Sequence, residues 1–128
     1  MAVRDLDAAA AWYHAVFGAK VVHRELVEHD GVEEALIQVA DSYVQLLAPT
    51  RDDSPVARFL AKRGEGLHHV AYRVDDCAAA LAQAAANGAI PIDAAPRPGS
   101  RNTTVAFLHP AGAFGTLIEL VQVRKAGS

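Results

Sequence analysis

Two apolar runs of this sequence each carry one oxygen-bearing side chain. Gln45 lies within YVQLL and Glu119 within LIELV, and His69 lies in a third run, LHHVAYRV. A polar group inside an apolar strand costs on the order of 2 to 7 kcal/mol unless it has a partner. One imidazole and two side-chain oxygens suit a borderline-hard divalent cation, whereas the lack of thiol ligands disfavours a structural zinc site. We therefore predict that Gln45, His69 and Glu119 converge on one metal ion.

Each of these side chains also has an ordinary structural interpretation. Glu119 could face water on an edge strand, His69 could be a core histidine with satisfied hydrogen bonds, and Gln45 alone would be unremarkable. Successive side chains of a strand point to opposite faces, so a ligand role for His69 implies that the neighbouring His68 is not a ligand.

The elements that must position these side chains occur twice. The run LHHVAYRVDD precedes an Ala-rich helix, and the chain opens with the tail of the same pattern, AVRDLD, before another Ala-rich helix. The two copies overlay at an offset of about 69 to 71 residues. The counterpart of His69 therefore falls before Met1. A duplication that serves architecture alone is the plain alternative to a duplicated site.

In the first half, the sequence predicts one helix, three strands and a second helix. The first helix runs from Asp5 or Asp7 to Gly18, and the strands span 21–27, 32–40 and 43–47. Ser54-Pro55 is a strong helix start, because proline is favoured at the first helical position, and this helix ends near Gly64.

The second half repeats the order, with a strand at 67–74, a helix at about 76–88 and strands near 90–94, 103–109 and 116–123. The unit is βαβββ, with the first strand of the first copy truncated at the N-terminus. We predict an α+β fold in which two tandem βαβββ modules form a cupped mixed sheet. The modules span about 1–50 and 66–124, a helix at about 54–64 joins them, and together they form a single domain over 1–128.

The composition narrows the classes of partner and compartment. A chain of 128 residues that is 52% hydrophobic can bury one sizeable core. The formal net charge of −3 argues against nucleic acid, which needs a basic excess. The single Cys77 cannot form an internal disulfide, which fits a reducing cytoplasm, and the Ala-rich stretches are too short to span a membrane.

Several longer motifs resemble one family. The segments GVEEA, YVQLLAPT, GEG followed by LHHVAYRVDD, APRPGSRNTTVAFLHP and GTLIELVQ look like methylmalonyl-CoA epimerase of the vicinal oxygen chelate superfamily. The likeness extends from about Val3 to Gln122. HHVAYRV alone is typical of the whole superfamily, whereas GEGLHH together with YVQLL and FLHP is much more specific.

The resemblance implies a divalent ion, commonly Co2+, with Mn2+, Ni2+ or Zn2+ as other candidates. The family binds it through two His, one Gln and one Glu, and Gln45, His69 and Glu119 match three of these positions. The fourth ligand, in the family's opening D-H-hydrophobic-G strand, would precede Met1. Glu34 matches the family's non-ligand acid/base, although from the residues alone Glu33-Glu34 after a turn is more often a solvated pair.

The resemblance also implies an activity, a substrate and an oligomeric state. The expected reaction interconverts the R and S forms of methylmalonyl-CoA through an enolate, with Glu34 and Glu119 as the two bases, and a homodimer is expected by analogy. An acyl-CoA substrate carries phosphates, which need a local cationic patch. The candidates, each more ordinarily a surface residue, are Arg58, Lys62, Arg97 and Arg101.

Three other functions remain open at this point. A glyoxalase I-type isomerase typically places a carboxylate where this chain has Gln45. An extradiol dioxygenase would need two His and one carboxylate, and only one such His is present. A metal-free binding protein of the bleomycin-resistance kind would be consistent with the missing first His but not with the retained Gln45, His69, Glu119 and Glu34.

Overall fold

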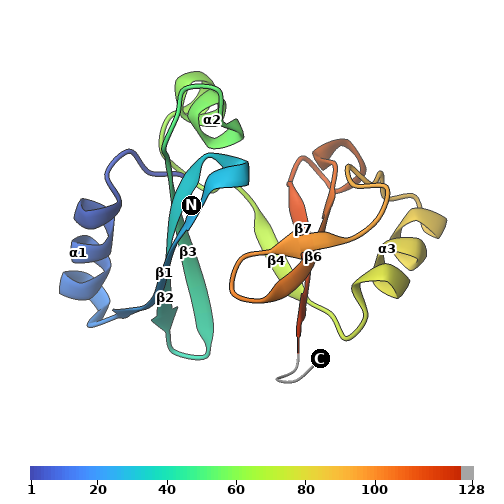
Figure 1. Ribbon diagram of the computed structural model, residues 1–128, viewed down its shortest axis with the longest axis horizontal. Coiled ribbons are helices and arrows are strands. Elements are labelled where there is room, and N and C mark those ends of the chain that lie inside the picture. The colour runs from blue at the N-terminus through green and yellow to red at the C-terminus, as the bar shows by residue number, and fades with distance from the viewer. Residues whose placement is uncertain (125–128) are drawn as a thin grey trace. The chain divides into compact units, whose positions relative to one another are not determined.

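The computed structural model describes residues 1–124, and the chain divides after His68 into two compact units. Each unit holds a β-sheet covered by helix, which confirms the predicted α+β class with one βαβββ-like module in each half (Figure 1). That the two modules make up one domain stays a prediction, and its last four residues lie outside the described ones. No helix within residues 1–124 has the length and apolar character needed to cross a bilayer.

The first helix of the first unit begins and ends where the sequence predicts. Helix α1 spans Leu6–Phe17, and the Asp5 side chain caps it by accepting a hydrogen bond from the Ala8 amide at 3.0 Å. Gly18 follows with φ 66°, a left-handed conformation that glycine adopts without steric cost, and its amide donates to the carbonyl of His14.

The sheet of the first unit is antiparallel, in the order β1-β2-β3. Strand β1 spans Lys20–Val27, β2 Val32–Val39 and β3 Ser42–Pro49, and the short helix η1 (Glu28–Asp30) connects β1 to β2. Helix α1 covers one face, where Leu6 packs with Ala35, Ile37 and Leu46 (Figure 1).

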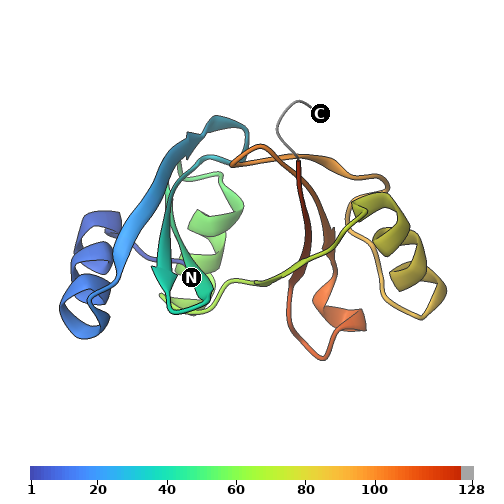
Figure 2. The ribbon, with the colours of Figure 1, turned by 90° about the horizontal axis from the view of Figure 1, so that it is seen from below.

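Helix α2, Pro55–Arg63, packs beside β3 on the opposite face (Figure 2). Its Val56 and Leu60 form a second cluster with Val32 and Leu47, which belong to the other set of alternating strand side chains. The Ser54 hydroxyl caps the helix by accepting from the Ala57 amide, and the helix ends before Gly64, as predicted. Beyond this cluster, the same face of the sheet carries polar side chains, and we call this part its polar face.

The first residues of the chain occupy the place of a fourth strand beside β3. Ala2 forms a parallel bridge with Leu47, and the Val3 amide donates to the Leu47 carbonyl at 2.9 Å. In the second unit the Val74 amide donates to the Val121 carbonyl in the same way, at 2.8 Å. Val3 thus corresponds to Val74, at the upper end of the predicted offset.

The terminal amine of Met1 takes part in this pairing. It donates to the backbone carbonyl of Gln45 at 2.9 Å, and its burial lowers its pKa to about 6.

The second unit holds a four-stranded mixed sheet in the order β4-β7-β6-β5. Its strands are β4 (Val70–Arg73), β5 (Arg97–Gly99), β6 (Thr103–Leu108) and β7 (Ile118–Val123), and β4 runs parallel to β7. Helix α3 (Cys77–Ala86) packs against the face formed by β6 and β7 in both ribbon views (Figures 1 and 2), and η2 (Pro110–Gly112) precedes β7.

The predicted strand near 90–94 is wrong, and β5 lies instead at Arg97–Gly99. Segment 90–94 still runs along β6, since the Ile92 amide donates to the Phe107 carbonyl at 2.9 Å. Pro91 has no amide hydrogen to donate, and the Asp93 carboxylate takes over the next position by accepting from the Phe107 amide at 2.7 Å. A side chain therefore replaces the backbone pairing that a regular strand would make.

Candidate functional site

Glu34 lies at the centre of the polar face of the first sheet. Alternation along β2 places Val32, Glu34 and Leu36 on this face, and Glu34 is only 2% exposed. The side-chain amide of Gln45, on β3, donates a hydrogen bond to the carboxylate of Glu34. The predicted base and one predicted metal ligand are therefore in direct contact.

Glu33, the neighbour of Glu34 in the sequence, faces the other way. Its carboxylate accepts from the Arg24 guanidinium at 2.6 Å, and its side chain is 37% exposed. Arg24 also donates to Asp7, and these two carboxylates raise the pKa of Arg24. The pair that looks solvated in the sequence thus contains one surface carboxylate and one buried carboxylate.

The hydrogen bond from Gln45 fixes which end of its amide faces Glu34. Because the nitrogen donates to the carboxylate, the amide oxygen is directed away from Glu34 and keeps its capacity to accept. An amide oxygen is a suitable ligand for a hard or borderline divalent ion. Gln45 can therefore hold the base and contribute a metal ligand at the same time.

In the second unit, His69 and Glu119 form a buried pair. The Nε2 atom of His69 lies 3.5 Å from Oε1 of Glu119, and the two side chains are 7% and 12% exposed. His69 precedes β4, which begins at Val70 and is shorter than predicted, and Glu119 lies on β7. An imidazole nitrogen and a carboxylate oxygen at this separation are donors that one divalent ion can share after a small adjustment.

The aromatic ring of Phe107 holds the imidazole of His69. Phe107 lies opposite Glu119 in the β6–β7 pairing, and its ring meets that of His69 edge to face at 5.7 Å. The guanidinium of Arg97 lies 5.6 Å from the same ring. His68 contacts Phe59, with ring centroids 5.0 Å apart, so the two adjacent histidines have different partners although both precede β4.

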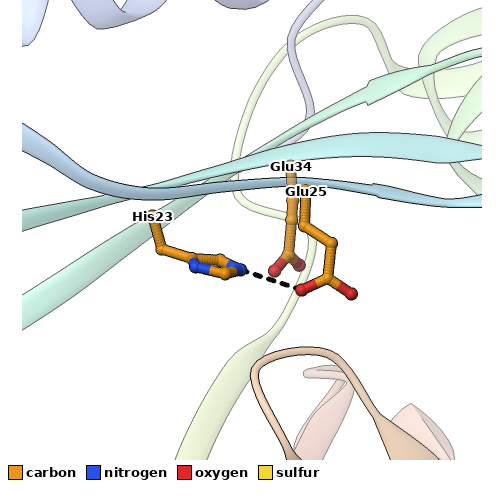
Figure 3. Close-up of side chains that lie close together, drawn as sticks. All are labelled: His23, Glu25 and Glu34. Atoms are coloured by element: carbon orange, nitrogen blue, oxygen red, sulfur yellow. Dashed lines mark hydrogen bonds and ion pairs between the residues drawn. The ribbon is translucent and has the colours of Figure 1, made fainter.

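Two residues that the sequence did not single out extend the polar face of the first sheet. His23 and Glu25 lie on β1, and Glu25 is paired directly with Glu34 of β2. Figure 3 shows the three side chains projecting from the same side of the sheet. One ligand atom from each lies within 4.8 Å of the others, so this group could hold a metal ion.

The sequence does contain a signal for this group. The run HRE has alternating side chains, so a histidine and a carboxylate two positions apart share one face of a strand. It was missed because such a run on a strand next to a turn is typical of a solvated edge. Only the pairing with β2 places it beside a buried carboxylate.

The four predicted cationic residues have mixed surroundings. Arg58 donates to the Asp53 carbonyl at 2.6 Å, Arg97 lies 3.3 Å from Asp93, and Nε of Arg101 is buried. Lys62 lies on the exposed side of α2. Contact of any of them with a CoA phosphate stays a prediction.

Comparisons with known proteins show which family the chain resembles. A family model described as the glyoxalase/bleomycin resistance protein/dioxygenase superfamily matches residues 1–107. The chain is 38% identical over 125 residues to the ethylmalonyl-CoA/methylmalonyl-CoA epimerase of Cereibacter sphaeroides, covering 96% of this chain and 93% of that protein.

Two solved structures are similar over nearly the whole chain. The methylmalonyl-CoA epimerase of Mycobacterium tuberculosis superposes with a TM-score of 0.90 at 39% identity, covering 96% of this chain and 83% of that one. A variant of the Streptomyces coelicolor methylmalonyl-CoA epimerase, in complex with 2-nitronate-propionyl-CoA, superposes with a TM-score of 0.91 at 40% identity. That match covers 95% of this chain and 91% of the other.

Proposed function

The chain belongs to the glyoxalase/bleomycin resistance protein/dioxygenase superfamily, as a relative of its methylmalonyl-CoA epimerases, and on this premise we propose that it interconverts the R and S forms of methylmalonyl-CoA. The observation that carries the proposal is Glu34, a carboxylate 2% exposed and held by the amide of Gln45. A buried, positioned carboxylate is suited to act as the general base in such a proton transfer.

Epimerisation removes a proton from one face of the carbon between thioester and carboxylate, and returns a proton to the other face. We assign Glu34 and Glu119 as the two bases. One carboxylate takes the α-proton, which leaves an enolate, and the other carboxylate then donates its own proton to the opposite face of that carbon. Each well-placed proton-transfer group typically contributes on the order of 10² to 10⁴ in rate.

Gln45, His69 and Glu119 are the residues we assign as ligands of a divalent ion. The donor set, one nitrogen and two oxygens, fits such an ion, and the separation of 3.5 Å between His69 and Glu119 supports it. When bound, the ion would stabilise the negative charge that develops on the substrate oxygen. By family resemblance we propose Co2+, a homodimer and a cytoplasmic location.

Gln45 then has two tasks. Its amide nitrogen positions the carboxylate of Glu34, and its amide oxygen is available as a ligand. The ring of Phe107 packs against the imidazole of His69. The relatives support an epimerase and do not support a glyoxalase I-type isomerase or a metal-free binding protein.

Exchange of the α-proton with solvent deuterium tests the assignment of Glu34. In Glu34→Gln the shape and the contact with Gln45 are preserved but the base is lost. For the epimer whose α-proton faces residue 34, we expect the rate of exchange to fall by at least on the order of 10²-fold. The metal content should stay unchanged. Glu33→Gln is the matched control, because Glu33 lies on the other face. Undiminished exchange from both epimers of Glu34→Gln would remove Glu34 from the mechanism.

A further inference from the structure

His23 lies beside Glu34 because β1 pairs with β2 in regular register from His23 onward, with His23 opposite Leu36 and Glu25 opposite Glu34. A bulge lies just before this stretch: Val21 pairs with Ile37 and His23 with Leu36, so Val22 is the extra residue between them. Across the bulge the alternation is broken, so Val21 and His23 face opposite sides of the sheet.

The group combines one buried side chain with two that are partly exposed. Glu34 is 2% exposed, whereas the side chains of His23 and Glu25 are 38% and 35% exposed. Nε2 of His23 lies 2.8 Å from Oε1 of Glu25. One ring nitrogen of His23, one carboxylate oxygen of Glu25 and one carboxylate oxygen of Glu34 lie within 4.8 Å of one another. A gap of that size can be bridged by one water molecule or closed by a rotation of the ring. The group therefore links a buried carboxylate to solvent (Figure 3).

A two-base epimerase must restore its protons after each turnover. If Glu34 has gained a proton and the opposite base has lost one, the enzyme cannot repeat the reaction in the same direction until both are restored. At 2% exposure, Glu34 has little direct access to bulk water. Imidazole is the side chain that most readily accepts and releases protons near neutral pH.

We propose that His23, supported by Glu25, is the proton relay that returns Glu34 to its basic form between turnovers. The inference rests on the proposed epimerase function. In the relay step the carboxylic O–H bond of Glu34 breaks and an N–H bond forms on the ring nitrogen of His23 that carries no hydrogen, and nothing is oxidised or reduced. Glu25 stabilises the resulting imidazolium, which then gives its proton to water. His23 acts through Glu34 and does not touch the substrate.

The test compares single and multiple turnovers of methylmalonyl-CoA. In a single turnover with enzyme in excess, the relay is not needed, so His23→Ala and His23→Gln should epimerise within about threefold of the wild type. Under saturating substrate, both variants should slow by on the order of 10-fold, because restoring the proton becomes limiting. Added imidazole should recover much of the loss in His23→Ala, where the deleted ring leaves space.

His29→Ala is the matched control, since His29 is exposed on η1, and it should behave as the wild type in both regimes. Wild-type behaviour of His23→Gln would show that the contact with Glu25, and not proton transfer, is what matters, and would overturn the relay.

Metal analysis of the same variants tests whether His23, Glu25 and Glu34 bind a metal ion instead. A loss of bound metal in His23→Gln together with a slower single turnover would identify the group as a metal site and overturn the relay. If the wild type does not epimerise methylmalonyl-CoA at all, the proposed function itself fails. If the wild type turns over and His23→Gln matches it, only the relay fails.

Discussion

Asp93 replaces a missing stretch of strand, and removing it should destabilise the second unit. Its Oδ2 accepts from the Phe107 amide at 2.7 Å and its Oδ1 from Nε of Arg97 at 3.3 Å, and the side chain is 18% exposed. The bond to the amide involves a charged acceptor and is worth about 1.5 to 3 kcal/mol. The ion pair with Arg97 is partly exposed and adds about 0.2 to 1 kcal/mol.

Asp93→Ala should therefore lower the free energy of unfolding by about 2 to 4 kcal/mol. Asp93→Asn keeps a neutral acceptor and should cost about 1 kcal/mol. The control is Asp75→Ala, at an exposed aspartate of the same unit, with an expected change below about 0.5 kcal/mol. Urea unfolding followed by circular dichroism gives the overall loss of structure, and thiol labelling of Cys77, in α3, reports on this unit alone.

A change smaller than about 0.5 kcal/mol in Asp93→Ala would refute this reasoning, because water would then be replacing the carboxylate at no cost. An effect on unfolding without any change in Cys77 labelling would place the loss outside the second unit. The expected effect also reaches the site, since Phe107 is the residue that contacts His69.

Three further outcomes are expected. Cys77 is buried and should label slowly in the folded protein, and fast labelling would contradict this. Burial also raises the pKa of its thiol, so the free energy of unfolding should fall as the pH rises through the thiol pKa of the unfolded chain, near 9.0. Gly31→Ala should cost more than about 1 kcal/mol in urea unfolding, because Gly31 has φ 64° and the added Cβ would come within 2.9 Å of Ser54 and 2.8 Å of Arg51. Leu46→Ala should cost about 2 to 5 kcal/mol, because Leu46 is fully buried against α1, and a loss below 1 kcal/mol would mean that the site collapses around the smaller side chain.

Local chemistry accounts for the parts of the fold that were predicted well. Asp5, Gly18, Ser54 and Gly64 each act on backbone groups within a few residues, so the ends of α1 and α2 can be read directly from the sequence. The repeat was equally legible, because the apolar pattern and the cap motif recur in the same order. The irregular backbone of segment 90–94 could not be predicted in this way. There the Asp93 carboxylate takes the place of a strand hydrogen bond by accepting from the amide of Phe107 in β6, fourteen residues further along the chain.

The candidate site could be predicted only in part, because it also depends on contacts between distant segments of the chain. The sequence identified Gln45 and Glu119 as polar residues in apolar strands, and the structure gives each a buried polar partner in its own unit. It could not distinguish the surroundings of Glu33 and Glu34, because a register shift of one residue exchanges the two faces of a strand. It also gave no reason to associate His23 with Glu34.

The sequence by itself therefore determined the order of helices and strands, their caps, the duplicated module and the side chains able to do chemistry. These depend on residues near one another in the chain. Only the tertiary structure decided which carboxylate is buried, which face His23 occupies and what holds His69 in place. Those outcomes depend on strand register, on one bulge and on cross-strand neighbours, and these are set by packing between segments that the linear pattern does not bring together.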